Sequence, residues 1–317
     1  MWWDKPNANK APAPEQKPLP FMKIRWIGFL VTLAMIVVTT VSLATQGLNM
    51  GLDFTGGVQI EATSTKPFDV ELVRSEVTQA GFKESNVTTS QGGTTIIIRV
   101  PLEAGSSVEQ IAGKITTALG PGAKVLKTDN VSGKVSDELF QRGILACLLA
   151  VMGIGAYVWL RFEVKFGTGA FLTTFHDVYA VIGLWSVTQM TFDLTIVAGV
   201  LTVAGYSIND TVVVYDRIRE MLKKYKKLTI SQVIDISITA TLSRTLMTSV
   251  TVMLSALAMV FLGGPVLAGF GIAIVFGVII GTFSSIFVAA PLLIHLPGRI
   301  PGAKYRGDEA GAAKAAT

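Results

Sequence analysis

The stretch that most constrains the fold is GYSINDTVVVYDRIRE, residues 205–220. It completes an apolar run that begins near Leu194, and about 20 largely apolar residues are enough to cross a bilayer as a helix. Asn209 and Asp210 stand side by side in this run, well before the charged residues at its end. An ionisable group at the centre of a spanning helix costs at least about 2.5–3.5 kcal/mol on insertion scales, so Asp210 indicates a functional site.

The composition of the whole chain is that of an integral membrane protein. Of its 317 residues, 50% are hydrophobic and 15% are charged, whereas soluble domains carry about 25% charged residues. The net charge of +5 is explained by loop topology rather than by binding to nucleic acid. The lone Cys147 excludes a disulfide framework within the chain and any multi-Cys metal site. We also expect no bound metal and no cofactor.

The apolar segments predict an α-helical membrane protein with six transmembrane helices. The segments are about Trp26–Ala44, Gly143–Leu160, Gly169–Thr188, Leu194–Tyr215, Thr245–Leu262 and Ala268–His295. Ser42-Leu43-Ala44 resembles a cleavage site, but the first run is longer than the usual signal-peptide core of about 7–15 residues, which favours an uncleaved anchor.

Lysine and arginine placement predicts the orientation of these helices. Every second link is basic, including the loop near 216–240, whereas the short links 189–193 and 263–267 carry neither residue. Because basic loops stay in the cytoplasm, both termini should be cytoplasmic. Residues 1–22, rich in Pro, Lys and Asn, predict a disordered cytoplasmic tail, and 296–317 predict a second cytoplasmic tail.

Residues 45–140, between the first two helices, predict one extracytoplasmic domain. Its order is βαββαβ, that of a ferredoxin-like α+β domain. The strands are expected at Val58–Ala62, Val87–Ser90, Thr94–Val100 and Ala123–Thr128, with a turn at Gln91-Gly92-Gly93, and the helices at Val70–Ala80, after Asp69 as N-cap, and Val108–Leu119. The domain has no His, no Cys and no phosphate loop, so it reads as a binding or mechanical module.

Other polar groups accompany Asp210 in the predicted spans. His176 and Asp177 lie about two turns into the third helix, and Arg244 lies near the start of the fifth, after the amphipathic stretch Ile230–Ile238. All three sites fall at a similar predicted depth, toward the cytoplasmic half, where carboxylate and guanidinium can meet.

Two polar stripes at matched depth favour a hydrated or proton-conducting seam between helices. The fifth helix carries Arg244, Thr248, Thr251 and Ser255, and the fourth carries Thr202, Tyr206, Asn209 and Asp210. In the sixth helix a small residue recurs every fourth position, which permits close helix contact: Gly269, Ala273, Gly277, Gly281, Ser285 and Ala289.

Structural interpretations compete with the functional ones. Asp216 and Arg217 are typical of an interfacial pair that anchors the helix at the membrane surface. His176 with Asp177 is equally consistent with a structural tie, and Asp210 with Arg244 is consistent with a static buried ion pair. A buried pair is a poor source of stability, because desolvation can cancel its attraction, which favours a proton-exchanging role for Asp210.

Four motifs, in order, resemble those of the SecF family of the bacterial Sec protein-translocation apparatus. They are Gly51–Gly57 (GLDFTGG), His176–Val178, the combination of Ser207–Thr211 with Asp216–Glu220, and Ser243–Thr245. Phe54 matters because the sister subunit SecD usually has leucine at that place. The resemblance covers about Lys23 to Pro297.

The resemblance implies a function. The chain would form half of a twelve-helix SecDF assembly with SecD, of the resistance-nodulation-division transporter type, in the bacterial inner membrane and surrounded by its lipids. That assembly would work with the SecYEG channel and use the proton-motive force to help translocating preproteins. Asp210 and Arg244 match positions of the proton relay, with Asn209 beside them, protons being the coupling ion.

The resemblance further implies that the signature residues Gly51, Asp53, Phe54, Gly56 and Gly57 form a hinge of a moving outer domain. Two other classes stay open: a half-transporter for lipids or drugs, and a scaffold whose polar pairs are structural. An enzyme is disfavoured, because neither a nucleotide motif nor a catalytic triad is present.

Overall fold

The structure is a computed structural model that describes residues 17–82, 85–90, 93–101, 107–226 and 228–296. The chain divides into two compact units. We call Met1–Leu48, Cys147–Met190 and Thr195–Thr317 the helical unit, and Asn49–Ala146 with Thr191–Leu194 the sheet unit. The sheet unit therefore contains a four-residue turn that lies far along the sequence from the rest of it.

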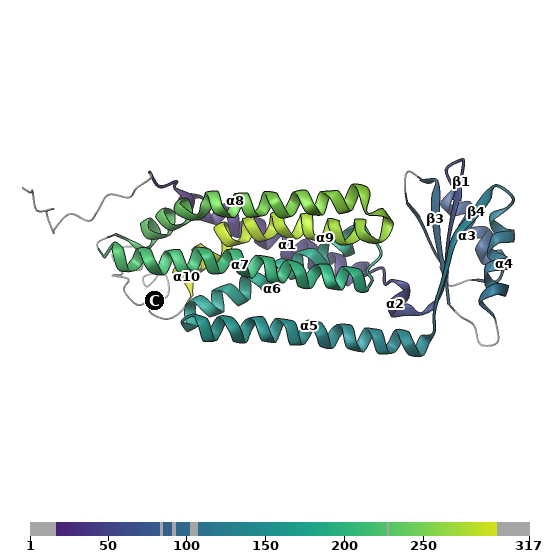
Figure 1. The fold of residues 1–317 in the computed structure, drawn as a ribbon, viewed down its shortest axis with the longest axis horizontal. Coiled ribbons are helices and arrows are strands. Elements are labelled where there is room, and N and C mark those ends of the chain that lie inside the picture. The colour runs from purple at the N-terminus through teal and green to yellow at the C-terminus, as the bar shows by residue number, and fades with distance from the viewer. Residues whose placement is uncertain (1–16, 83–84, 91–92, 102–106, 227, 297–317) are drawn as a thin grey trace, which may run out of the picture. The chain divides into compact units, whose positions relative to one another are not determined.

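Long helices dominate the chain (Figure 1). They are α1 (Arg25–Thr45), α5 (Gly133–Arg161), α6 (Val164–Thr188), α7 (Leu194–Lys224), α8 (Ile230–Leu262) and α9 (Gly264–Ser284), which continues through the π-helical η3 (Ser285–Ala289) into α10 (Ala290–His295). Within the described residues, six helical stretches are long and apolar enough to cross a membrane, so the six predicted spans are confirmed.

Several of these helices extend beyond the apolar runs. Helix α7 continues from Tyr215 to Lys224, and α8 starts at Ile230 rather than Thr245. The reason is a hydrophobic cluster in which Ile218, Met221 and Ile234 are buried. Apolar side chains at helical spacing therefore continue on the inner face although charged residues interrupt the hydropathy.

Small residues let the spanning helices approach closely. A Cβ atom on Gly277 of α9 would collide with Val203 of α7, and one on Gly183 of α6 would collide with Thr39 of α1. The close contact predicted from the row of small residues in the last span is thus present against α7. Larger side chains at these positions would push the helices apart.

The chain before α1 is ordered where the sequence predicts disorder. Phe21–Ile24 form the 3₁₀-helix η1, and Met22 is buried. The Met22 amide donates to Asp235 Oδ1 of α8 at 2.9 Å, and the Leu19 amide donates to Thr239 Oγ1 at 3.0 Å. The disordered tail expected through residue 22 is therefore wrong for Phe21 and Met22, because a carboxylate far along the sequence satisfies the start of the turn. Residues 1–16 lie outside the described residues.

The sheet unit has the predicted βαββαβ order. Its elements are the short α2 (Leu52–Thr55), β1 (Gly57–Ser64), α3 (Val70–Gln79), β2 (Asn86–Ser90), β3 (Thr95–Val100), α4 (Val108–Leu119) and β4 (Ala123–Val131). In the described part of this unit the strands pair antiparallel in the order β2-β3-β1-β4. The predicted turn at 91–93 falls mostly outside the described residues.

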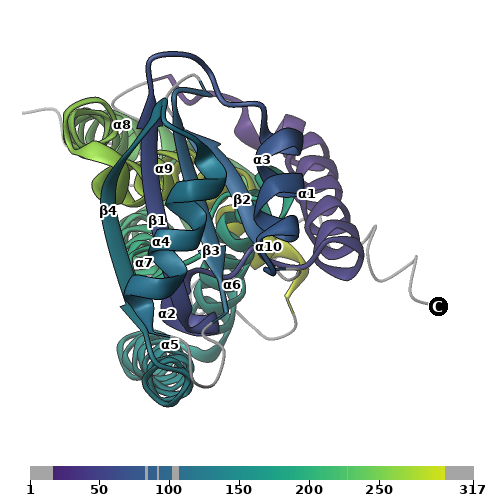
Figure 2. The ribbon, with the colours of Figure 1, turned by 90° about the vertical axis from the view of Figure 1, so that its right-hand side faces the viewer.

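Helices α3 and α4 cover one face of this sheet (Figure 2). Val58, Ile60, Ile96 and Ile98 of the sheet are buried with Ile115 of α4, which is the alternation expected of strands with one covered face. The Asp69 carboxylate accepts from the amides of Glu71 and Leu72, as expected of an N-cap, and a Ser107–Gln110 capping box starts α4.

Candidate functional site

Asp210 is buried inside the helical unit. Asp210 is 2% exposed, whereas the neighbouring Asn209 is exposed. The Tyr206 hydroxyl, one helical turn earlier, and the Arg244 guanidinium of α8 both interact with the Asp210 carboxylate. Among the described residues, its Oδ2 atom has no hydrogen-bond partner. One buried carboxylate oxygen is thus left available, which is the arrangement expected of a group that binds and releases a proton.

Arg244 differs from the sequence-based expectation in its exposure. It is an exposed residue of α8, and in the part of the chain that the structure describes it forms no direct ion pair with Asp210. The two charges interact across a gap instead of touching. The structure therefore does not contain a static contact ion pair between Asp210 and Arg244.

The polar stripe of α8 is largely self-satisfied. The hydroxyls of Thr248, Thr251 and Ser255 donate to the carbonyls of Arg244, Met247 and Thr251, at 3.1, 2.8 and 3.2 Å. Hydroxyl groups that bond back to their own helix keep oxygen lone pairs free to accept.

A chain of hydroxyl groups crosses three helices close to Asp210. Tyr206 Oη and Ser249 Oγ are 2.7 Å apart, and Ser249 Oγ and Thr282 Oγ1 of α9 are also 2.7 Å apart. Ser249 additionally donates to the Thr245 carbonyl at 2.7 Å. Ser249 has one hydroxyl hydrogen, so while it donates to Thr245 it must accept from both Tyr206 and Thr282. The Tyr206 hydroxyl can instead donate to Asp210, and it then accepts from Ser249.

Asp177 lies in a different environment, fully buried and well supplied with donors. Its Oδ1 is 2.8 Å from His176 Nδ1, and its Oδ2 accepts from Ser284 at 2.7 Å and from Ser207. Helices α6, α7 and α9 thus meet at one carboxylate. His176 Nε2 is buried and has no hydrogen-bond partner among the described residues. Both Asp177 oxygens already have hydrogen-bond partners, so this carboxylate links α6, α7 and α9 and does not offer a free acceptor.

The π-helical turn η3 follows Ser284 directly. A π-turn widens the backbone, and such turns occur often at functional sites. The Tyr215 hydroxyl donates to the Ala289 carbonyl at 2.9 Å at the end of this turn. The Tyr215 ring is fully buried and contacts Phe166 edge to face, with ring centroids 5.2 Å apart. Both ends of η3 are therefore fixed by side-chain hydrogen bonds to neighbouring helices.

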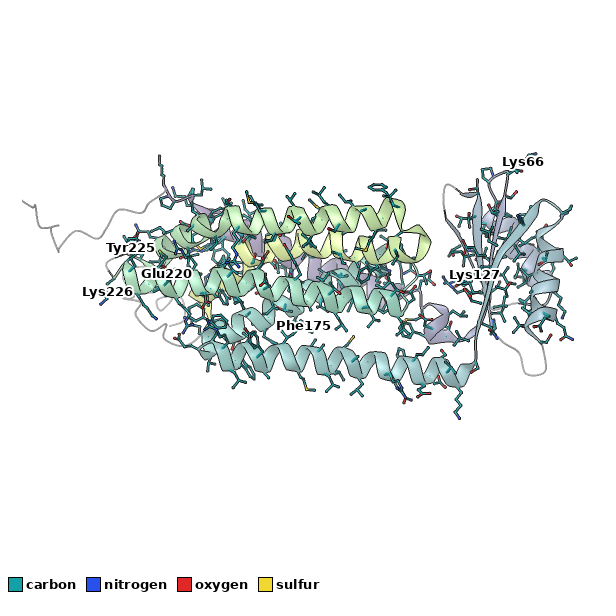
Figure 3. All side chains as sticks on the ribbon, in the orientation of Figure 1. Lys66, Lys127, Phe175, Glu220, Tyr225 and Lys226 are labelled. Carbon is teal, nitrogen blue, oxygen red and sulfur yellow. The ribbon has the colours of Figure 1, made fainter. Side chains whose placement is uncertain are left out.

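The residues predicted as an interfacial anchor do not pair with each other. Asp216 Oδ2 lies 3.1 Å from Arg161 Nη2, and Arg217 Nη1 lies 2.6 Å from Glu220 Oε2. Figure 3 marks Glu220, Tyr225 and Lys226 at this end of α7. The pairs are partly exposed, so each contributes about 0–1 kcal/mol. The anchoring role itself stays a prediction.

The glycine-rich signature lies in the sheet unit and contacts the α6–α7 turn. Gly51 N donates to Phe192 O at 2.8 Å, and Asp53 Oδ2 accepts from Leu194 N at 3.1 Å. Phe54 stacks on Phe192 with ring centroids 6.2 Å apart. Gly56 and Gly57 have φ of 67° and 109°, a region that favours glycine. The hinge role of this segment stays a prediction.

The charged members of these sites and Tyr206 are predictable from the sequence, but the contacts of their serine partners are not. Ser207 stands in the motif Ser207–Thr211, but nothing in the motif indicates its contact with Asp177. Ser249 and Ser284 have no distinguishing pattern, because a serine in a spanning helix usually bonds to its own backbone. No group of three or more His, Cys, Asp or Glu side chains that could hold a metal ion occurs in the described parts of the chain.

The family "Protein export membrane protein SecD/SecF, C-terminal" matches residues 111–299, and the "SecD/SecF GG Motif" matches residues 41–67. The protein translocase subunit SecF of Pseudomonas aeruginosa is 41% identical over 281 residues, covering 87% of this chain and 90% of the relative. That of Escherichia coli O157:H7 is 36% identical over 286 residues, covering 89% and 88%.

A crystal structure of SecDF, a translocon-associated membrane protein from Thermus thermophilus, superposes with a TM-score of 0.81 at 34% identity. It covers 88% of this chain, which spans 39% of that longer SecDF chain. A SecDF structure in the super-membrane-facing form gives a TM-score of 0.66 at 31% identity, covering 95% of this chain and 40% of that one.

The fold and the buried polar sites define a multi-pass membrane protein of the SecD/SecF export class. Within that class, the chain belongs to the SecF family.

Proposed function

We propose that this chain is the SecF subunit of a SecDF complex, which assists preprotein translocation through the SecYEG channel and is driven by the proton-motive force. The observation that carries the proposal is the buried Asp210, which has one unpartnered oxygen and interacts with Tyr206 and Arg244. A carboxylate kept at this cost inside a spanning helix is best explained by proton exchange.

The Tyr206 hydroxyl supplies a way to link the protonation of Asp210 to helix contacts. When Asp210 is ionised, it accepts a hydrogen bond from Tyr206. When Asp210 is protonated, Tyr206 is released to donate to Ser249, 2.7 Å away on α8. Proton binding thus changes which helix Tyr206 is bonded to, and the Ser249–Thr282 contact extends the change to α9.

SecD is the proposed partner in the membrane. Asn209 of α7 and Arg244 of α8 are exposed on the isolated chain although both lie in spanning helices. A guanidinium facing lipid at this depth is costly, so helices of another subunit should cover it. We assign the SecD contact to the side of the helical unit that carries these two residues.

The proposed setting is the bacterial inner membrane. The basic links, including Arg161 and the Lys223–Lys226 region, face the cytoplasm, and so do both termini. The sheet unit is then extracytoplasmic, where it meets emerging preproteins. The relatives are named as translocase subunits, which supports a transport component rather than an enzyme.

The energy available is of the right order. One charge that crosses 100 mV is worth about 2.3 kcal/mol, whereas switching a two-state element almost completely takes about 5.5 kcal/mol. More than one proton, or added work from the pH gradient, is therefore needed for each full stroke.

The test is a vesicle assay with this chain, SecD and SecYEG. We expect Asp210→Asn to insert and bind SecD normally but to abolish proton conductance and proton-dependent release of preprotein. Asp216→Asn, a carboxylate near the end of the same helix that is partly exposed, is the matched control and should behave as the wild type. Full conductance and full export with Asp210→Asn would rule out the relay and favour a scaffold.

A further inference from the structure

The turn between α6 and α7 belongs structurally to the sheet unit and not to the helices that it joins. Thr191–Leu194 group with Asn49–Ala146. Phe192 pairs with Met50 in a parallel β-bridge, in which Phe192 N donates to Asn49 O and Gly51 N donates to Phe192 O, both at 2.8 Å. The turn is therefore held by backbone hydrogen bonds on both sides of Phe192.

Asp53 holds the end of this turn by capping α7. Its Oδ2 accepts from the amide of Leu194, the first residue of that helix, at 3.1 Å. The first amides of a helix have no partner within the helix, and a carboxylate at this end interacts favourably with the helix dipole. A cap usually comes from the residue just before the helix, but here it comes from a residue 141 positions earlier in the sequence.

Arg99 holds the other end of the turn from strand β3. It is 7% exposed, its Nη2 donates to Thr191 Oγ1 at 2.5 Å, and its Nε donates to Gln59 Oε1 of β1 at 2.7 Å. Burial lowers the pKa of Arg99, while the charges of Asp193 and Asp53 act in the opposite direction. A buried guanidinium with these partners fixes the turn to the sheet in one geometry.

We propose that Asp53 and Arg99 are positioning residues that clamp the α6–α7 turn to the sheet unit, so that the turn moves with this unit as one body. The proposal rests on the proposed function, because it names the residues through which movement of the sheet unit reaches α7, the helix that carries Asp210. The sheet unit then bends relative to the helices at some point other than the contact between Gly51–Gly57 and Thr191–Leu194. The opposite arrangement would be a hinge at that contact, in which Gly51–Gly57 move against the turn.

A disulfide across the clamp tests this directly. Met50 and Phe192 are bridge partners, so their Cα atoms lie about 4.8 Å apart, within the disulfide range of about 4.4–6.8 Å. Met50→Cys with Phe192→Cys, in a Cys147→Ala background, should form the bond on oxidation. We expect export by the oxidised and the reduced protein to be equal. Export lost on oxidation and restored by reductant would overturn the proposal, because the two segments would then have to separate.

Substitution of Arg99 tests the clamp by weakening it, whereas the disulfide locks it. Loss of hydrogen bonds to a buried charged group corresponds to at least about a tenfold fall in the docked population. We expect Arg99→Gln to reduce export by a similar factor while proton conductance persists, and Arg99→Lys to recover little, because lysine lacks the fork that reaches Gln59 and Thr191 together. Arg74→Gln removes an exposed arginine of the same unit and should change nothing.

These results are separable from failure of the proposed function. The disulfide comparison uses one protein in two redox states, so its outcome does not depend on Asp210 being the proton carrier. Thermal unfolding of the Arg99 variants shows whether the sheet unit is still folded. Arg99→Gln that remains folded and exports normally would also overturn the clamp.

Discussion

The Tyr206 hydroxyl of α7 and the Ser249 hydroxyl of α8 are 2.7 Å apart and join the two helices that carry Asp210 and Arg244. Ser249 continues the connection to Thr282 of α9. The carboxylate therefore lies one helical turn from a hydroxyl chain across the helical unit. Such a chain can transfer a proton or transmit a change in hydrogen bonding.

Tyr206→Phe should weaken coupling without removing the proton site. It deletes the hydroxyl and keeps the ring, and one hydrogen bond worth about 1 kcal/mol corresponds to about a fivefold effect. We expect proton flux in vesicles to fall by about this factor. Tyr179→Phe, which removes the hydroxyl that contacts Thr40 at 2.9 Å, is the matched control. Equal flux in both variants would show that the chain through Ser249 has no part in transfer.

Arg244→Lys should be damaging although the charge is kept. Arg244 interacts with Asp210 without direct contact, and a lysine ammonium is more compact and more strongly hydrated than a guanidinium. We expect impaired proton flux, and Arg217→Lys at the end of α7 provides the control.

The double variant Asp210→Asn with Arg244→Gln separates relay from scaffold. A relay has lost its proton carrier and stays inactive. A scaffold needs only charge balance and should recover export relative to either single variant. Recovery would contradict the relay.

Asp177→Ala should destabilise the helical unit rather than only change proton flux. It would leave His176, Ser207 and Ser284 without their common acceptor, at about 1–3 kcal/mol for each buried unpaired group. Ser284→Ala removes one donor and should cost about 1 kcal/mol. Unfolding in detergent measures both. A stably folded Asp177→Ala protein that lacks proton flux would instead make Asp177 a proton carrier.

Most of the fold could be predicted from local pattern, and the departures have specific causes. Apolar runs of membrane-spanning length located all six of the membrane-length helices in the described part of the chain. Helices α7 and α8 run further because Met221 and Ile234 are buried beyond the apolar runs. The segment at Met22 is ordered because Asp235 accepts a hydrogen bond from the Met22 amide. No local pattern reveals a partner so distant in sequence.

The site was predictable residue by residue but not as an arrangement. Asp210, Asp177 and Arg244 are conspicuous, because charged groups in spanning helices are costly. The different surroundings of the two carboxylates could not be predicted. Asp210 has an unpartnered oxygen and Asp177 has a full set of donors, and this difference depends on which serines of other helices lie beside each one. The cap that Asp53 provides for α7 has no sequence signal either, because the two lie in separate segments.

The π-turn η3 sets the rotational phase of the last span. Ser284, just before it, faces Asp177, and the Ala289 carbonyl at its end faces Tyr215. One residue more or less in an α-helix turns everything beyond it by about 100°. The wide turn therefore lets one continuous span offer a hydrogen-bonding group to α6 and then another to α7. An uninterrupted α-helix of the same composition could keep only one of these contacts in register.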